Sequence, residues 1–171
     1  MSNDLVHPAE LGGFPGAPFS QEVVDSAVAE LRDILGWHVA PRRTETVTLD
    51  NEGGGTEIVL PSRHVVAVDE VRDVSGATPA VMTGWRLTQA QTLTRGSWPI
   101  GGSGLEVDLD HGHDDVPQDL LPVVAALCQT LLTSATAGQQ TAGPFSVTAA
   151  TRQQIMANHA STLARHSART L

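Results

Sequence analysis

The sequence contains no lysine and no tyrosine, and Cys128 is its single cysteine. A P-loop is excluded, because that motif holds phosphate groups with a lysine. One cysteine cannot form a disulfide within the chain, which fits a reducing compartment such as the cytoplasm. Three phenylalanines and three tryptophans are the only aromatic residues apart from histidine, and small side chains such as alanine, valine and glycine supply much of the apolar content. Burial per residue is then limited, and oligomerisation can supplement it.

Long apolar runs are also absent. No stretch reaches the roughly 20 apolar residues that a membrane-spanning helix needs. The N-terminal sequence Met-Ser-Asn-Asp-Leu-Val-His-Pro has no basic segment followed by an apolar run, so we expect no secretion signal. The length of 171 residues suits one modest domain with a tail, or at most two small lobes.

No aspartate or glutamate follows Asp119, although the net charge of the chain is −9. Residues 1–136 hold nineteen acids and seven arginines, a net charge of −12, whereas residues 137–171 hold three arginines and no acid. Such an acidic protein is a poor candidate for gripping nucleic acid, because phosphate binding needs a basic face. It can still surround DNA without holding it. The basic tail either docks on an acidic partner or packs on its own acidic body.

The first regular element is predicted to be a helix over 20–36, after an irregular N-terminal arm over 1–19. Ser20 is a favourable N-cap, and Gly36 is a natural end. The apolar residues between them recur at helical spacing. They are Val23, Val24, Ala27, Val28, Leu31, Ile34 and Leu35.

Residues 44–110 change to the period of two that is typical of β-strands. The clearest strand, 105–110, alternates leucine and valine with Glu106, Asp108 and Asp110, and we interpret these carboxylates as its solvent-facing side. The other expected strands are 44–49, 56–60, 65–71 and a short pair at 84–87 and 91–94.

Two details of this region bear on the strand boundaries. The alternation of the third strand slips near Asp69, which indicates a bulge or a strand end there. The segment 101–104, Gly-Gly-Ser-Gly, superficially resembles a phosphate-binding loop, but it precedes a strand instead of joining a strand to a helix. We interpret it as a flexible loop.

A second helix is predicted over 117–136. Asp115 can cap it, and Pro117 suits its first turn, whereas Pro122 indicates that this first turn is irregular. Its apolar residues cover more than one side, so the helix must be buried on several sides, either by neighbouring subunits or by a central packing position. These residues are Leu120, Leu121, Val123, Val124, Leu127, Cys128, Leu131 and Leu132.

These elements predict an α+β fold, in which the helices pack together with an inserted small antiparallel β lobe and an extended C-terminal arm. Residues 20–136 form the folded domain, with the β lobe at 44–110, and residues 137–171 form a linker and a C-terminal segment. A helix over 150–168 is expected to place a mixed apolar and basic face against a partially polar groove of a partner. That face consists of Arg152, Ile155, Met156, His159, Leu163 and His166.

One cluster has the residue types of a metal site. His111 and His113 share a side if the strand continues through them, and Asp114 follows. The other histidines are scattered along the chain and no cysteine is near, so we interpret the cluster as a polar turn that caps the second helix. We expect no catalytic residue, no cofactor and no metal, and hence no enzyme.

Four segments in order resemble the head-to-tail connector proteins of long-tailed bacteriophages, which are also called adaptor or head-completion proteins. Trp37-His38-Val39-Ala40-Pro41 follows the first helix, and residues 56–68 are similar to the strand, Leu-Pro, strand step of that family. Residues 105–120 resemble its junction of strand, His-Gly, Val-Pro-x-Asp-Leu and helix. Residues 143–147 are similar to its Gly-aromatic-Ser segment. The chain departs from the family in His113, where an aromatic residue often stands, and in a longer C-terminal extension.

This resemblance implies a structural protein of the virion neck, assembled in the host cytoplasm. Such proteins form a homo-oligomeric ring, usually a dodecamer, below the portal protein, where they extend the DNA channel and meet a stopper or another neck protein. The resemblance implies that DNA passes through without sequence-specific binding and that the C-terminal segment reaches the portal. Two alternatives are another neck or tail protein, such as a stopper or tail terminator, and a small metal-dependent hydrolase that uses His111, His113 and Asp114.

Overall fold

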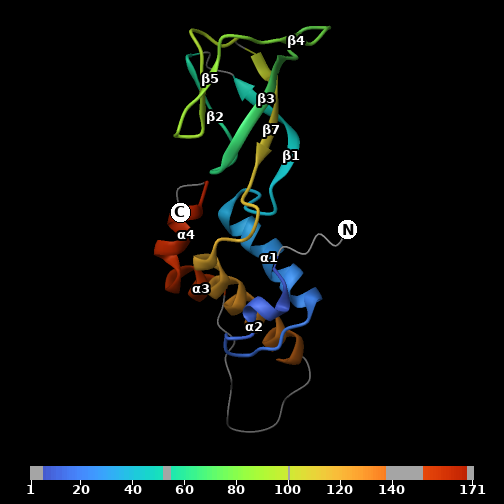
Figure 1. Cartoon of the computed structure of the whole chain (residues 1–171), viewed down its shortest axis with the longest axis vertical. Coiled ribbons are helices and arrows are strands. Elements are labelled where there is room, and N and C mark those ends of the chain that lie inside the picture. Colours follow the sequence, from blue (N-terminus) through green and yellow to red (C-terminus); the bar gives the residue numbers. More distant parts are fainter. Residues whose placement is uncertain (1–5, 52–54, 100, 138–151, 169–171) are drawn as a thin grey trace. The chain divides into compact units, whose positions relative to one another are not determined.

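The computed structural model describes residues 6–51, 55–99, 101–137 and 152–168. The chain divides into two compact units. One unit combines Met1–Trp37 with Asp115–Leu171, and the other is His38–Asp114. The first unit is helical and the second is built of β-strands, which confirms the predicted α+β fold with an inserted antiparallel lobe (Figure 1).

Helix α1, Gln21–Leu35, has the ends that the sequence indicates. The Ser20 hydroxyl accepts a hydrogen bond from the Val23 N–H at 3.4 Å, and Gly36 adopts the left-handed conformation with φ 78°. Glycine adopts that conformation without the steric cost that a side chain brings. The apolar stripe of the helix is buried and comprises Val24, Ala27, Val28, Leu31, Ile34 and Leu35.

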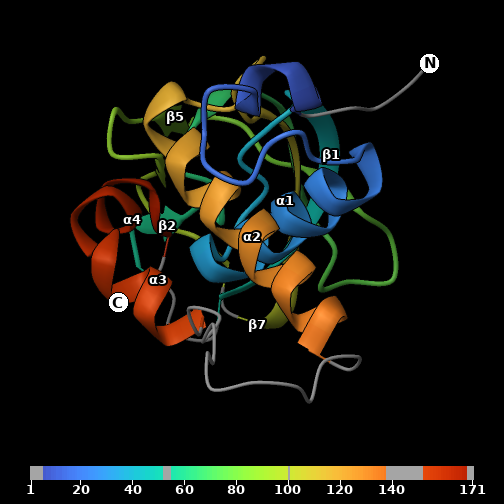
Figure 2. The same ribbon diagram turned by 90° about the horizontal axis from the view of Figure 1, so that it is seen from below.

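Helix α2, Leu121–Ala137, follows a short 3-10 turn, η2, at Gln118–Leu120. Pro122 is the second residue of α2, where a missing N–H leaves no helical hydrogen bond unmade. The helix lies beside α1 (Figures 1 and 2) and also contacts α3 and η2. Its buried residues are Val123, Val124, Ala125, Leu127 and Cys128. Helix α2 therefore occupies a central packing position within the chain itself. This position accounts for its several apolar sides without neighbouring subunits.

The N-terminal arm contains one short regular turn, and the C-terminal segment differs from expectation. Within 1–19, residues Pro8–Leu11 form a 3-10 turn, η1, and Leu11 is buried in the first unit. The C-terminal segment forms two short helices, α3 at Arg152–Asn158 and α4 at Ala160–His166, instead of one helix over 150–168. None of the described helices combines the length and the apolar composition of a membrane span.

The second unit contains two antiparallel sheets. The larger has the strand order β1-β7-β3-β4, and the smaller has the order β2-β6-β5. The strands are β1 Arg43–Asn51, β2 Glu57–Val59, β3 Val65–Asp73, β4 Ala80–Val81, β5 Arg86–Leu87, β6 Thr92–Thr94 and β7 Gly101–His111.

The register of these strands tests two predictions, the irregularity near Asp69 and the loop at 101–104. The pairing of β3 with β7 shifts between Val68 and Glu70, which confirms a bulge at Asp69. The expected loop at 101–104 is wrong, because β7 begins at Gly101 and this glycine pairs with Asn51 of β1. Glycine lowers the local preference for a strand, but a neighbouring strand in register overrides that preference here.

The core of the second unit lies on one side of the β1-β7-β3 strands. Alternate residues of β7 face it, and the smaller sheet and the loop before β7 supply the rest. The fully buried members include Val71, Leu93, Leu105, Val107 and Leu109, with Trp98 3 % exposed. The alternation leaves the acidic side chains of β7 on the opposite side of the sheet.

Candidate functional site

The six C-terminal residues predicted to dock on a partner belong to the chain's own first unit. Ile155 is 2 % exposed and Leu163 is fully buried. Met156 and His159 are partly exposed. The Trp37 indole N–H donates a hydrogen bond of 2.6 Å to the His166 carbonyl, and the Ala168 N–H donates one of 3.0 Å to the Leu35 carbonyl.

Basic side chains of the same segment pair with acids of the first unit. The Arg152 guanidinium lies 2.7 Å from a carboxylate oxygen of Asp33. Arg165 lies 3.1 Å from Asp119, and the His166 ring nitrogen lies 2.9 Å from the same carboxylate. The charge asymmetry left two alternatives for the basic tail, docking on an acidic partner or packing on the chain's own acidic body. The structure shows the second arrangement for the described part of the tail.

The candidate metal residues do not come together. The His111 ring nitrogen Nε2 lies 2.9 Å from Glu45 Oε1, and its ring meets His38 edge-on at a centroid distance of 5.8 Å. His113 instead stacks on His64, with centroids 4.1 Å apart. Gly112 between them has φ 94°, which turns the chain out of the strand and sends the two rings to different neighbours. In the described ranges, no group of three or more histidine, cysteine or carboxylate side chains is placed to hold a metal ion.

His111 is a buried imidazole with a charged neighbour. Burial lowers the pKa of His111 below 6.5, and this effect outweighs the opposing attraction of Glu45. Its second ring nitrogen, Nδ1, is buried without a hydrogen-bond partner among the described residues. A neutral ring that donates from Nε2 to Glu45 leaves Nδ1 as an unpaired acceptor, whereas a protonated ring would leave a buried unpaired donor. The neutral form therefore suits this position.

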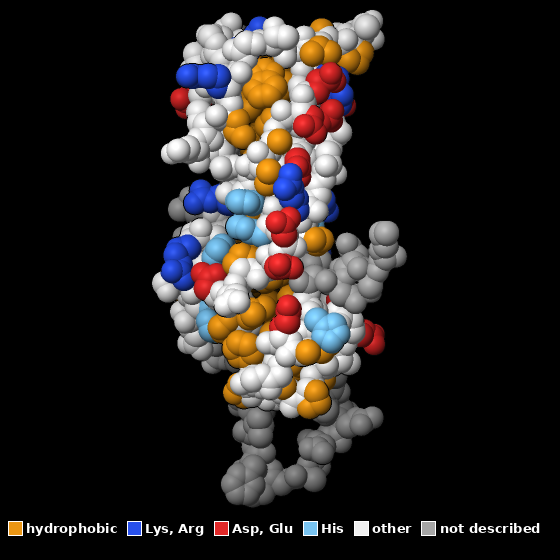
Figure 3. All heavy atoms as spheres, in the orientation of Figure 1, with side chains coloured by type: hydrophobic (Ala, Val, Ile, Leu, Met, Phe, Trp, Pro, Cys, Tyr) orange, Lys and Arg blue, Asp and Glu red, His pale blue; other side chains and the backbone are white. Residues whose placement is uncertain are grey.

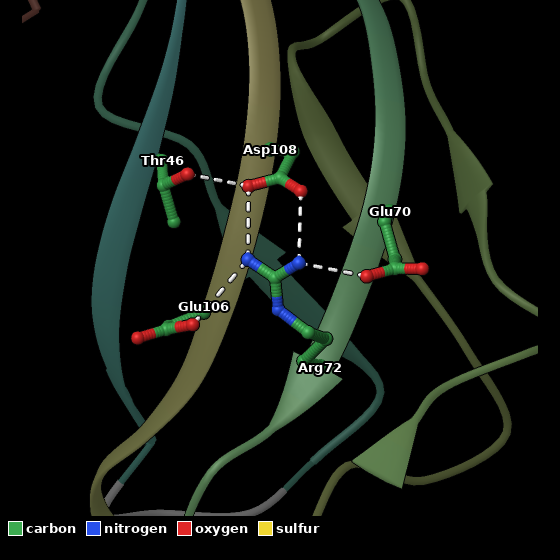
Figure 4. A network of polar contacts seen from close by, with 5 residues as sticks. All are labelled: Thr46, Glu70, Arg72, Glu106 and Asp108. Carbon is green, nitrogen blue, oxygen red and sulfur yellow. Dashed lines mark hydrogen bonds and ion pairs between the residues drawn. The ribbon is translucent and has the colours of Figure 1, made fainter. Parts of the chain in front are cut away.

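The solvent-facing side of the β1-β7-β3 strands carries a network centred on Arg72 of β3 (Figure 4). Both terminal nitrogens of Arg72 lie 3.0 Å from the two carboxylate oxygens of Asp108, in a bidentate pair. Glu70 and Glu106 approach the same guanidinium to 2.7 and 3.3 Å. The Thr46 hydroxyl donates a 2.6 Å hydrogen bond to Asp108. This bond and the Arg72 pair lower the pKa of Asp108.

A second pair extends the network along the sheet. The Arg42 Nε–H donates to Asp110 at 2.8 Å, and this pairing lowers the pKa of Asp110. Figure 3 shows the result as acidic and basic side chains interspersed along one edge of the β unit. The sequence identified Glu106, Asp108 and Asp110 as a solvated acidic side, and it missed the arginines. Arg72 is 34 residues or more from these acids in the chain, and only the strand register brings them together.

No protein-family model matches the chain, and no curated protein matches its sequence. Solved structures of similar fold do exist. A chain in "Neck of empty GTA particle computed with C6 symmetry" has a TM-score of 0.62 and 19 % identity, and the match covers 98 % of this chain and 92 % of that one. A chain in "Virion of native gene transfer agent (GTA) particle" has a TM-score of 0.60 and 20 % identity, over 99 % and 93 % of the two chains.

A third similar chain comes from "Neck of native GTA particle computed with C12 symmetry". Its TM-score is 0.56 and its identity is 21 %, with 88 % of this chain and 83 % of that one covered. At identities this low, the similarity concerns the fold, and it extends over both units of the chain. The fold of this protein is thus one that also occurs in chains of gene transfer agent particles.

Proposed function

We propose that this chain is a structural protein of a virion neck, and specifically a head-to-tail adaptor that forms a ring below the portal. The observation that carries the proposal is the fold match, which covers nearly the whole of this chain and more than nine-tenths of a chain from a particle neck. Two such neck structures were computed with C6 and C12 symmetry, and this cyclic symmetry supports a homo-oligomeric ring.

The charge of the chain supports a role in extending a DNA channel. The chain has a net charge of −9, and the described cationic side chains of the β-sheet network are paired with carboxylates. A wall of this kind repels the phosphate backbone and lets DNA slide without sequence-specific contacts. In this role the protein needs no catalytic residue, no cofactor and no metal, and we propose that it is not an enzyme.

We further propose that the C-terminal helices contact the portal, while the other side of the ring meets a stopper or another neck protein. Met156 and His159 keep partly exposed side chains in the packed state, and Arg152 stays exposed while it pairs with Asp33. Ile155 and Leu163 are buried, so contact through these two residues requires α3 and α4 to leave the first unit.

The proposal is tested by the mass of the assembly. Native mass spectrometry of the purified full chain, alone and mixed with its portal, should show a closed ring of about twelve copies. Negative-stain images should show a central opening. A chain that stays monomeric in both conditions would contradict the adaptor role. Cross-linking in assembled particles identifies the neighbours, and a chain that touches only tail proteins would instead be a stopper or a tail terminator.

A further inference from the structure

Strand β1, Arg43–Asn51, forms one edge of the larger sheet, and β7 is its sole partner strand among the described elements. Its nine residues make it much longer than the other sheet edges. Those edges are β4, β5 and β2, with two, two and three residues. A long strand edge presents unpaired backbone N–H and C=O groups, which are a template for another strand.

Two hydrogen bonds, one made just beyond the end of β7 and one made within it, show which groups of β1 face outward. The Gly112 N–H donates to the His64 carbonyl at 2.9 Å, and the Val74 N–H donates to the Gly104 carbonyl at 2.8 Å. The even-numbered residues of β7 thus direct their backbone groups toward β3, and the odd-numbered residues direct theirs toward β1, because these directions alternate along a strand.

The register then assigns the groups of β1. Odd-numbered residues of β1 stand opposite odd-numbered residues of β7, as Val47 does opposite Val107. They use their backbone groups in the ladder with β7. The backbone N–H and C=O groups of Thr44, Thr46 and Thr48 therefore point away from the sheet, along its free edge.

Over Arg43–Leu49 the free edge of β1 has little of the usual protection against pairing, because the register shift of β1 against β7 lies beyond this stretch, between Leu49 and Asn51. It contains no proline, and the chain has no lysine to place there. The charged side chains Arg43 and Glu45 pair with each other. The residues whose backbone groups face outward are three threonines, which favour strands and have short side chains.

The chemistry beside the edge indicates what kind of strand it fits. Thr44, Thr46 and Thr48 stand opposite Asp110, Asp108 and Glu106 of β7, on the solvent side of the sheet. The three acids of β7 and Glu70 make four carboxylates on this side of the sheet. Only two arginines in the described part of the chain, Arg42 and Arg72, are bound to them, which leaves an excess of acid among these residues. A strand added beyond β1 would place its basic side chains over the short threonines and within reach of this acidic excess.

We propose that the free edge of β1 binds an extended segment of a second protein, which adds to the sheet as a further antiparallel or parallel strand. The segment alternates basic residues, on the side of the threonines, with apolar residues, on the side of Val47 and Leu49. The choice of a second protein rests on the proposed ring. A cyclic rotation does not bring β1 of one copy onto β1 of the next, which requires a two-fold axis, and the other described edges are too short to match nine residues.

The test uses ¹⁵N-labelled full-length protein and a capped seven-residue peptide of alternating valine and arginine. Addition of the peptide should shift the amide signals of Thr44, Thr46 and Thr48 and slow their hydrogen exchange. A peptide of alternating valine and glutamate should bind at least tenfold more weakly, since it places like charges over the acids.

Two variants separate backbone pairing from side-chain contact. Thr48→Pro removes an outward N–H and leaves the ladder with β7 intact, so it should weaken peptide binding at least tenfold. Thr48→Ala keeps the N–H and should bind like the wild type. Equal binding by wild type and Thr48→Pro, or no response of these amides, would overturn the proposal. So would protection of the same amides in a two-fold dimer without peptide, because a second copy would then occupy the edge. Ring formation is measured separately by native mass spectrometry, so a failure here leaves the adaptor role standing.

Discussion

Arg72 is the residue that ties the solvent side of the large sheet together. It joins β3 to β7 through Asp108 and also holds Glu70 and Glu106. A bidentate guanidinium–carboxylate pair has a fixed geometry, which a lysine in the same place would not reproduce. Without Arg72, three carboxylates within one small area would repel each other.

Replacement of Arg72 by methionine should therefore destabilise the β unit. We expect Arg72→Met to lower the urea midpoint of unfolding, and to do so more at low salt, because part of the pairing is screened by ions. Arg63→Met is the matched control, since Arg63 is exposed on a loop of the same unit. Equal midpoints for the two variants would show that the network contributes nothing to stability.

His111 makes the stability of the β unit depend on pH. Its pKa in the folded protein lies below 6.5, so the unfolded chain binds the proton more readily. The contribution of the neutral ring is fully present above about pH 6.5 and is lost as the pH falls through the folded pKa. Between pH 8 and pH 5, the free energy of unfolding measured with urea should fall less for His111→Leu than for the wild type. Parallel curves for the two proteins would contradict this assignment.

At the scale of elements, the packing of α4 distinguishes a folded tail from a free one. Leu163 is fully buried in the first unit, whereas Met156, on the same predicted side of the segment, is partly exposed. The structure thus makes Leu163 a core residue of the first unit, and a truncation there removes buried contacts.

Leu163→Ala should destabilise the protein by about 2–5 kcal/mol, the range for truncation of a buried leucine. Met156→Ala should cost clearly less. Chemical unfolding followed by far-ultraviolet circular dichroism measures both. An unfolding midpoint that Leu163→Ala leaves unchanged would mean that α4 is detached from the first unit in solution.

The element boundaries were predictable where local signals agree. Ser20 and Gly36 marked the ends of α1 to within a residue, because capping depends on the backbone of a few neighbouring residues. The start of β7 was not predictable, since the pairing of Gly101 with Asn51 depends on a strand some fifty residues earlier. The break between α3 and α4 at His159 likewise has no glycine or proline to announce it.

At the scale of the whole molecule, the inserted β unit separates the two long helices of the first unit in sequence. Residues 38–114 intervene between α1 and α2, which nevertheless pack side by side. Burying both helices therefore requires closure of a long loop, whose entropic cost grows only slowly with its length. This is how one short chain supports a helical unit and a β unit, each with its own core.

The sequence by itself determined the α+β class, both long helices and most of the strands, because each depends on a periodicity within a few residues. It also located an irregularity at Asp69, and the register of β3 with β7 showed that this irregularity is a bulge. Only the tertiary structure decided that Leu163 is buried, that Arg72 meets Asp108, and that β1 lies at the edge of the larger sheet among the described strands. These three outcomes depend on which distant segments become neighbours. That choice is made by the register of the strands and the packing of the helices, which no short stretch of sequence contains.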